Sequence, residues 1–225
     1  MNRPDFDAQF TLDREHYLSN LDMVTWVRHY HTLRDVLVGG GGDVLEIGTG
    51  DGIVRRCAEP MVASYKVLDI NPNLDPDYLG DIRRSDDSLL GRFDTIVITE
   101  VMEHLPFEDM PVSLRNLSSW LRPGGRVIVS LPHRKSSVAV LTPNQKLRTL
   151  RFPNGSISIS EFYNRFVRGR IWIDPYHLWE IGDGHVSRAD VERHFAEAGF
   201  VRQKRKQLPY SDYWVLTKRR APEAP

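Results

Sequence analysis

The residues best suited to chemistry lie in one stretch that starts as a predicted strand and runs into a predicted helix. From Val44 to Gly52 the sequence reads VLEIGTGDG. Glycines in such a turn let a ligand approach the backbone closely. A dinucleotide site of the G-x-G-x-x-G kind fits poorly, because residue 53 is isoleucine. The carboxylate of Glu46, at the end of the strand, disfavours a pyrophosphate and favours a cationic ligand.

Further polar residues follow the ends of later predicted strands. Asp69 ends a strand in the sequence VLDINP. Thr99 and Glu100 end a strand that is rich in β-branched residues. Because the carboxyl ends of parallel strands meet at one edge of a sheet, we expect these side chains to line one crevice.

The elements that must position these residues alternate along the chain. Apolar residues at three- and four-residue spacings predict helical structure over 12–38, which four glycines end. Strands alternating with helices indicate βαβ units and a mainly parallel sheet. The last two strands are closely connected and must be antiparallel. The predicted strands are 44–47, 65–70, 94–99, 126–131, 200–207 and 213–218, and the predicted later helices are 51–59, 108–121 and 187–198.

Five motifs in order resemble those of the class I S-adenosylmethionine-dependent methyltransferases. They are E-x-G-x-G-x-G over 46–52, an acid at 69, an aspartate at 81, a run from Phe93 to Leu105, and L-x-P-G-G over 121–125. The resemblance covers 44–131 closely and extends weakly to about 218. It implies an α/β fold with a doubly wound, seven-stranded Rossmann-like sheet of order 3-2-1-4-5-7-6, with strand 7 antiparallel. We expect a single domain over 1–225.

The resemblance implies that S-adenosylmethionine is the cofactor. Glu46 would then face its methionine end, Asp69 would accept both ribose hydroxyls, and Asp81 would accept from the adenine amine. The residues that the resemblance assigns to cofactor binding are Glu46, Gly48, Thr49, Gly50, Gly52, Asp69, Ile70, Asp81, Ile82, Thr99 and Glu100.

The regular alternation breaks over about 133–186, which we interpret as an insertion that forms a substrate lid, part-helical around 159–168. Residues 133–174 carry 8 Lys and Arg against 2 Asp and Glu, whereas residues 1–132 carry 13 against 21. Such a basic segment is either a solvated face or a rim for an anionic acceptor. Arg165 and Arg168 are candidate contacts to that acceptor, together with Arg134, Lys135 and Arg170.

Two histidines are the candidates for a catalytic base. His133 lies just beyond the predicted strand 126–131, and His177 lies three residues before Glu180. The segment 174–182 resembles a His/Trp-Glu segment of bacterial type-11 methyltransferases. His104 either contacts substrate or caps a helix, and Trp179 either contacts substrate or docks the lid. Other candidate bases are Glu100, Glu103, Glu180 and His185.

A metal is not expected, because the sequence contains no His-x-x-x-His or paired aspartate pattern. The only cysteine, Cys57, excludes an internal disulfide and is expected to pack on its helix. No apolar run approaches the roughly 18–20 residues of a membrane span, and the N-terminus does not read as a signal peptide. A cytoplasmic location is the simplest expectation.

The sequence therefore predicts methyl transfer to an oxygen or nitrogen of a small molecule or glycan. The alternatives are a non-catalytic S-adenosylmethionine-binding partner protein, or a methyltransferase acting on nucleic acid or protein. An amino-methylating DNA enzyme is disfavoured, because Thr99-Glu100-Val101-Met102 does not match [DNS]-P-P-[YFW]. The zero net charge gives no broad nucleic-acid footprint. The sequence leaves the oligomeric state open.

Overall fold

The computed structural model describes residues 22–134, 137–144, 147–151, 163, 167–168 and 173–219. Seven strands form one sheet of order β3-β2-β1-β4-β5-β9-β8. This confirms the predicted order, since the insertion contributes β6 and β7 and the last two strands become β8 and β9. The strands of the sheet are β1 Asp43–Ile47, β2 Ser64–Asp69, β3 Tyr78–Leu79, β4 Phe93–Thr99, β5 Leu121–Pro132, β8 Phe200–Gln207 and β9 Ser211–Lys218.

The strand directions bring the ends of β1 to β5 to one edge. Strands β1 to β5 pair in parallel, with Ile47 beside Leu68 and Ile98, and Thr99 beside Ser130. Strand β9 is antiparallel to both β5 and β8, as predicted. The loops that follow β1, β2, β3 and β4 therefore share the edge at which ligands bind in sheets of this kind.

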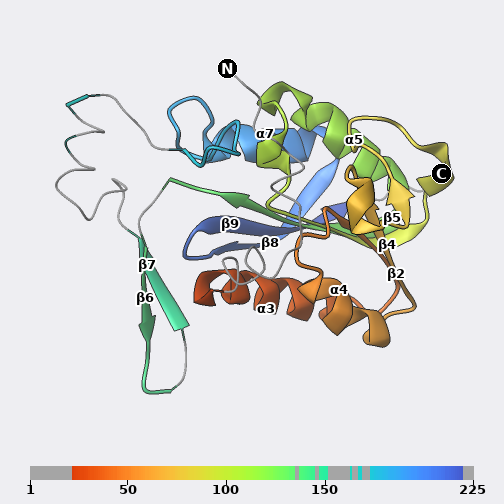
Figure 1. The fold of residues 1–225 in the computed structure, drawn as a ribbon, viewed down its shortest axis with the longest axis horizontal. Coiled ribbons are helices and arrows are strands. Elements are labelled where there is room, and N and C mark those ends of the chain that lie inside the picture. Colours follow the sequence, from red (N-terminus) through yellow and green to blue (C-terminus); the bar gives the residue numbers. More distant parts are fainter. Residues whose placement is uncertain are drawn as a thin grey trace, which may run out of the picture.

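Helices cover both faces of the sheet (Figure 1). Helices α3 (Met23–Val38) and α4 (Ile53–Ala58) lie on one face, and α5 (Met110–Trp120) and α7 (Arg188–Glu197) lie on the other. Short 3-10 turns lie at Glu59–Met61, Pro72–Leu74, Asp87–Leu89, Met102–His104 and Phe107–Asp109. This is the doubly wound arrangement that the motif order implies.

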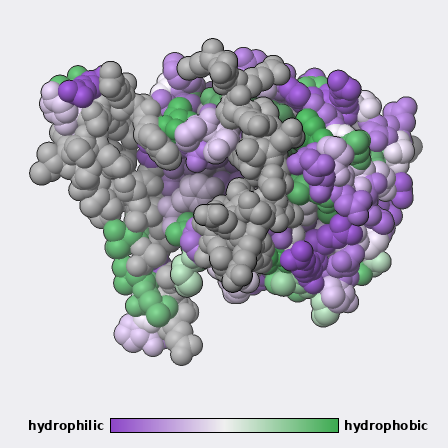
Figure 2. Space-filling view, viewed as in Figure 1, coloured by the Kyte–Doolittle hydropathy of each residue, from purple (hydrophilic) through white to green (hydrophobic). Residues whose placement is uncertain are grey.

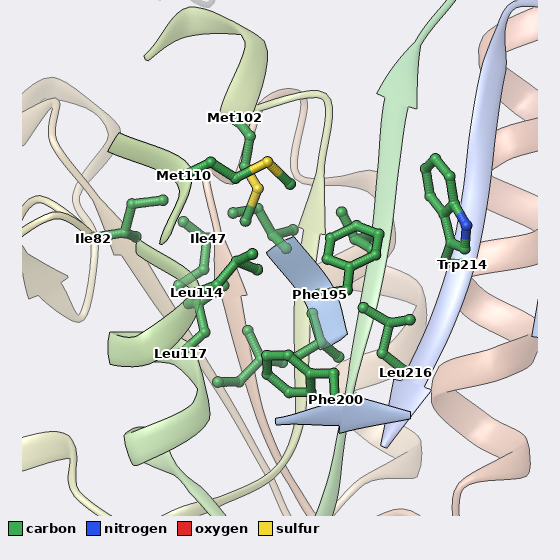
Figure 3. Close-up of a cluster of buried hydrophobic side chains, with 14 of the residues drawn as sticks. Ile47, Ile82, Met102, Met110, Leu114, Leu117, Phe195, Phe200, Trp214 and Leu216 are labelled. Atoms are coloured by element: carbon green, nitrogen blue, oxygen red, sulfur yellow. The ribbon is translucent and has the colours of Figure 1, made fainter. Parts of the chain in front are cut away.

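Each face has its own apolar core. On the α5 and α7 face, Ile47 of β1 packs with Leu114 and Phe195 (Figure 3). On the α3 and α4 face, Val36 and Val54 belong to a second cluster. Both clusters exclude water from the sheet, so the strand ends are held on a rigid frame.

Helix α3 begins at Met23, because Asp22 caps it by accepting hydrogen bonds from the amides of Val24 and Thr25. The part of the predicted helix before residue 22 lies outside the described residues. Cys57 is exposed on α4, against the prediction that it packs. The reason is that Val54 and Ala58 take the buried side of this short helix.

The described parts of the insertion behave differently from one another. Strands β6 (Ser137–Leu141) and β7 (Leu147–Arg151) form an antiparallel hairpin that extends from the sheet (Figure 1). Figure 2 shows apolar residues gathered on this hairpin, where Val138, Val140, Leu141 and Leu150 are exposed. Most of the predicted helix at 159–168 lies outside the described residues.

Residues 173–186, the last part of the predicted lid, dock on the sheet. Trp179, Ile181 and Val186 are buried in the core of the α5 and α7 face. Backbone hydrogen bonds join Ile181 to Pro132 and to Arg134, so this segment extends the end of β5. Among the described residues, no helix has the length and apolar character that a membrane span needs.

Candidate functional site

The loop after β1 requires glycine at its first position. Gly48 has φ of +71°, and a Cβ atom there would lie 2.7 Å from Cγ2 of Val101. Gly50 and Gly52 also have positive φ values. Side chains rarely adopt this conformation, so the motif is needed to turn the chain tightly from β1 into α4.

The loops after β1 and β2 are joined through Asp69. Its Oδ2 atom accepts a hydrogen bond from the Thr49 amide at 3.2 Å, and its Oδ1 atom accepts one from the Asn71 amide at 2.8 Å. Asp69 is 4% exposed, and this burial raises the pKa of its carboxyl group. Each oxygen keeps a further lone pair, so the carboxylate can accept from a vicinal diol.

An open cavity of about 770 Å³ lies at the ends of β2 and β3, and Leu68 and Ile70, the neighbours of Asp69 in the chain, line it. Ile70, which is 61% exposed, and Asp81 both line it. Ile82 is only 4% exposed and its side chain belongs to the core, so its backbone alone is left for a ligand. Asp81 already pairs with Arg83 at 2.6 Å, and this hydrogen bond lowers the pKa of the Asp81 carboxyl group.

Glu46 is buried on the face covered by α3 and α4. Burial raises the pKa of its carboxyl group to about 8, and the nearby Tyr65 hydroxyl opposes this shift. Among the described residues, no group donates a hydrogen bond to its Oε2 atom. A positive charge close to this buried carboxyl group would stabilise its ionised form.

Helix α3 adds two residues to the site that the sequence analysis missed. His29 Nε2 lies 3.0 Å from Oδ2 of Asp51, whose other oxygen accepts from the Ile53 amide at the start of α4. Arg28 Nη1 lies 3.9 Å from Oε1 of Glu100. The sequence did contain a sign of their role, because Arg28 and His29 are adjacent polar residues within an apolar helical pattern.

Glu100, directly after β4, has an unusual backbone conformation. Its φ is +57°, in the left-handed region that non-glycine residues seldom adopt. The Glu100 amide donates to the carbonyl of Ser130 at 3.1 Å, and the Ser130 hydroxyl donates to Oε1 of Glu100 at 2.6 Å. Strain of this kind is concentrated at functional sites. Thr99, at the end of β4, lies beside Ser130.

A second polar group gathers where residues 173–183 meet the loop after β4. His177 Nδ1 lies 2.9 Å from Oε1 of Glu180, and His177 Nε2 lies 4.0 Å from Oε1 of Glu103. The imidazole rings of His104 and His177 are 5.1 Å apart. Glu103 is fully buried, and its pKa is raised by burial and by repulsion from Glu100. The predicted contact between His177 and Glu180 therefore forms, although in a turn rather than in a helix.

Other candidates lie in places that change their interpretation. His133, a candidate base, is 5% exposed, and its Nε2 atom lies 3.3 Å from the carbonyl oxygen of Leu208. Trp179 is 3% exposed and donates from its indole nitrogen to the carbonyl of Leu105 at 2.9 Å. We therefore assign Trp179 to docking rather than to substrate contact.

The basic residues that were candidates for acceptor binding also differ in their surroundings. Arg134 Nη1 lies 3.5 Å from Oε2 of Glu180, so its charge is already opposed. Arg168 lies over the ring of Tyr163, with its guanidinium carbon 5.4 Å from the ring centroid, and both residues are exposed. Arg165, Lys135 and Arg170 lie outside the described residues.

The geometry thus brings together the loops after β1 and β2 through Asp69, an open cavity at the ends of β2 and β3, and a polar group at the ends of β4 and β5. This arrangement, on a sheet with an antiparallel seventh strand, defines the class I S-adenosylmethionine-dependent methyltransferases. A family model described as a methyltransferase domain matches residues 26–203. The chain belongs to this methyltransferase-domain family.

Solved structures support the same fold at low sequence identity. The N-methyltransferase NodS from Bradyrhizobium japonicum WM9, in complex with S-adenosylhomocysteine, has a TM-score of 0.63 and 17% identity, with 98% of each chain covered. The 1,6-didemethyltoxoflavin-N1-methyltransferase from Burkholderia thailandensis has a TM-score of 0.58 and 13% identity, covering 96% of this chain and 87% of that one. An S-adenosylmethionine-dependent methyltransferase from Mesorhizobium loti has a TM-score of 0.55 and 14% identity, covering 87% and 98%. No curated protein matches the sequence.

Proposed function

We propose that the chain transfers the methyl group of S-adenosylmethionine to an oxygen or nitrogen atom of a small molecule or a glycan. The observation that carries the proposal is Asp69, whose carboxylate accepts from the Thr49 and Asn71 amides. The next residue, Ile70, lines the open cavity at the ends of β2 and β3. Exposed Ile70 offers an apolar surface for the adenine ring. In this proposal Gly48, Gly50 and Gly52 pass beneath the cofactor.

The reaction is an in-line displacement. The acceptor lone pair forms a bond to the methyl carbon, the bond from that carbon to sulfur breaks, and S-adenosylhomocysteine leaves with the electron pair. Most of the catalysis comes from holding the two reactants in line. The acceptor proton passes to a base or to water.

The acceptor would lie at the ends of β4 and β5. Glu100, with its strained backbone, and the group of Glu103, His104 and His177 border this region. His177 is the better candidate for a base, since its two ring nitrogens lie near carboxylates, whereas His133 is buried against the Leu208 carbonyl. NodS and the toxoflavin enzyme are both named as N-methyltransferases, which supports a nitrogen acceptor here, and the second was crystallised with 1,6-didemethyltoxoflavin, which supports a small molecule.

The proposal can be made more specific: the acceptor would carry a negative charge. The excess of positive charge in residues 133–174 supports it, and exposed Arg168 is a described cation in that segment. Arg165 would act with it. Changing Arg165 and Arg168 together to Gln should raise the KM for the acceptor and reduce its dependence on salt. If the acceptor KM and its salt dependence stay unchanged, the basic segment does not recognise the acceptor.

The test of the main proposal has two parts. Calorimetry should find one S-adenosylhomocysteine bound per chain, and mass spectrometry with methyl-labelled S-adenosylmethionine should find label on a small molecule or glycan. Asp69→Ala should weaken the binding by roughly a hundredfold or more and reduce the labelling accordingly. Glu108→Ala, which removes an exposed carboxylate, should affect neither. Binding without transfer to any acceptor would favour a non-catalytic partner protein instead.

We also propose that residues 1–225 act as one domain in the cytoplasm. The free thiol of Cys57 is exposed on α4, which suits a reducing compartment. Limited proteolysis and fractionation of the native cells would test these two points.

A further inference from the structure

Three donor residues of the kinds that bind metals meet where the loop after β4 contacts the segment after the insertion. Glu103 and His104 belong to the turn Met102–His104, and His177 lies in the segment that packs against this turn. One donor atom from each of the three lies within 4.8 Å of the other two. The amide of Leu178 donates to the carbonyl of Glu103 at 2.8 Å, which holds the two segments together.

The hydrogen bonds of the two imidazole rings fix which nitrogen of each ring carries the proton. His104 Nδ1 lies 3.0 Å from the carbonyl oxygen of Tyr176, and a carbonyl only accepts, so this nitrogen carries the proton. His177 Nδ1 is held in the same way by the carboxylate of Glu180 at 2.9 Å. Each ring therefore keeps a lone pair on Nε2. Histidines that bind metals are oriented by this kind of outer hydrogen bond.

Glu103 supplies the second and independent observation. Its side chain is fully buried, and among the described residues neither carboxylate oxygen has a hydrogen-bond partner. Instead, an oxygen of Glu103 faces Nε2 of His177 at 4.0 Å, too far for a hydrogen bond between them. A buried carboxylate without a donor is costly unless a cation satisfies it.

The surrounding charges do not supply that cation. Glu100 is a second carboxylate near Glu103, and the described positive charge facing both is Arg28, which lies 3.9 Å from Glu100. Arg134 faces Glu180 instead. The two buried carboxylates thus share one guanidinium group, and one further positive charge would balance the group.

We propose that Glu103, His104 and His177 bind one divalent transition-metal ion. Two imidazole nitrogens and one carboxylate suit manganese, iron, cobalt, nickel or zinc better than calcium or magnesium, and this donor set leaves coordination positions open. Metal–ligand distances of about 2.0–2.2 Å require the three donors to move inward by roughly an ångström, which side-chain rotation provides. His104 is partly exposed and gives the ion a path from solvent.

The open positions would hold an oxygen of the methyl acceptor, and this part alone rests on the proposed function. The ion would orient that oxygen at the ends of β4 and β5. Because Nε2 of His177 would then bind the ion, the acceptor proton would pass to water rather than to His177. This proposal differs from the expectation from sequence that no metal binds. That expectation considered only short motifs such as His-x-x-x-His, whereas these three donors come from two segments that are distant in the sequence.

The test uses the full chain after treatment with a chelator, first without cofactor or acceptor. Mn²⁺ is titrated and followed by electron paramagnetic resonance, and Co²⁺ is titrated and followed by its visible absorption. We expect one saturable ion per chain, and a Co²⁺ spectrum typical of nitrogen coordination. Glu103→Gln and His177→Gln should each abolish saturable binding. Glu180→Gln should weaken binding by roughly 10–100-fold, because Glu180 is a positioning residue for His177.

His194→Gln is the matched control, since His194 lies beside a carboxylate of Glu197 on α7, away from the group. It should bind Mn²⁺ as the unchanged chain does. Glu103→Gln should also fold and melt at an equal or higher temperature than the metal-free chain, because it removes a buried charge. Failure to bind either ion, or binding that survives both Glu103→Gln and His177→Gln, would overturn the inference. Binding of S-adenosylhomocysteine, measured on the same samples, tests the proposed function separately.

Discussion

The two halves of the site are built in different ways. At the cofactor half, the loops after β1, β2 and β3 present backbone amides and a few side chains drawn from residues 46–82. At the acceptor half, Glu100, Glu103 and His104 meet Arg28 from α3 and His177 from beyond the insertion. The first half is local in sequence, whereas the second depends on contacts between distant segments.

This difference explains why one half is recognisable from a short motif. A turn such as the one at Gly48 is specified by the residues that form it, because only glycine fits there. A side-chain group such as Glu103 with His177 has no fixed spacing, so its partners can lie anywhere that the fold brings together. The predictions below test whether the two halves respond independently.

The largest expected effect concerns Glu46, in the cofactor half. Its pKa in the folded chain, about 8, exceeds its ordinary value of 4.5, so the folded state holds a proton that the unfolded state releases. Stability should therefore fall as pH rises from about 4.5 to about 8, by up to several kcal/mol from this group. Glu46→Gln should remove that part of the decline, as followed by urea unfolding across this pH range.

Saturating S-adenosylmethionine sharpens this test. Its positive charges should favour ionised Glu46, so the unchanged chain should lose less stability with rising pH when the cofactor is present. The raised pKa values of Asp69 and Glu103 also make stability fall as pH rises. The contribution of Glu46 is therefore measured as the difference between the pH profiles of Glu46→Gln and the unchanged chain. Identical pH profiles for these two proteins would show that Glu46 does not titrate in this way.

Asp69→Ala should produce the next largest effect. Loss of two charge-assisted hydrogen bonds, at about 1.5–3 kcal/mol each, should weaken S-adenosylhomocysteine binding by roughly a hundredfold or more. Mn²⁺ binding at the acceptor half should be unchanged if the halves are independent. Calorimetry with each ligand in turn measures both, and unchanged cofactor affinity would remove Asp69 from the cofactor site.

Gly48→Ala tests the local construction of the first half. The new Cβ atom would meet Val101 at 2.7 Å in a backbone conformation that already costs about 1–2 kcal/mol for a side chain. Gly40→Ala is a matched control, because φ is +94° there and no atom lies within 4 Å of the new Cβ. Gly48→Ala should lower the free energy of unfolding by about 2 kcal/mol, and by more than Gly40→Ala. Equal losses in urea unfolding would show that the contact with Val101 is unimportant.

Sequence reasoning predicted the fold, and it found candidate cofactor residues in the loop after β1, because both depend on motifs that are local in the sequence. The strand order follows from the resemblance that the motifs carry, and the antiparallel pairing of β8 and β9 follows from their short connection. It failed where long-range packing decides the outcome. Trp179 became a core residue because residues 173–186 dock on β5, and His133 became buried against Leu208. Arg83, which holds Asp81, was also missed, although it lies only two residues away.

The smallest effect concerns the docking of the acceptor half through Trp179. Trp179→Phe keeps an aromatic ring beside Phe107 but removes the hydrogen bond to the Leu105 carbonyl. Trp120→Phe is a matched control with the same change in volume, because among the described residues the Trp120 indole nitrogen has no partner. Loss of this hydrogen bond should therefore destabilise Trp179→Phe by about 1 kcal/mol more than Trp120→Phe, measured by urea unfolding.

The Trp179→Phe variant also tests whether the two halves are coupled. In this variant, the Leu178 amide, which donates to Glu103, should exchange its hydrogen faster, while S-adenosylhomocysteine affinity stays the same. A matching loss of cofactor affinity would mean that the two halves are coupled through the loop after β4.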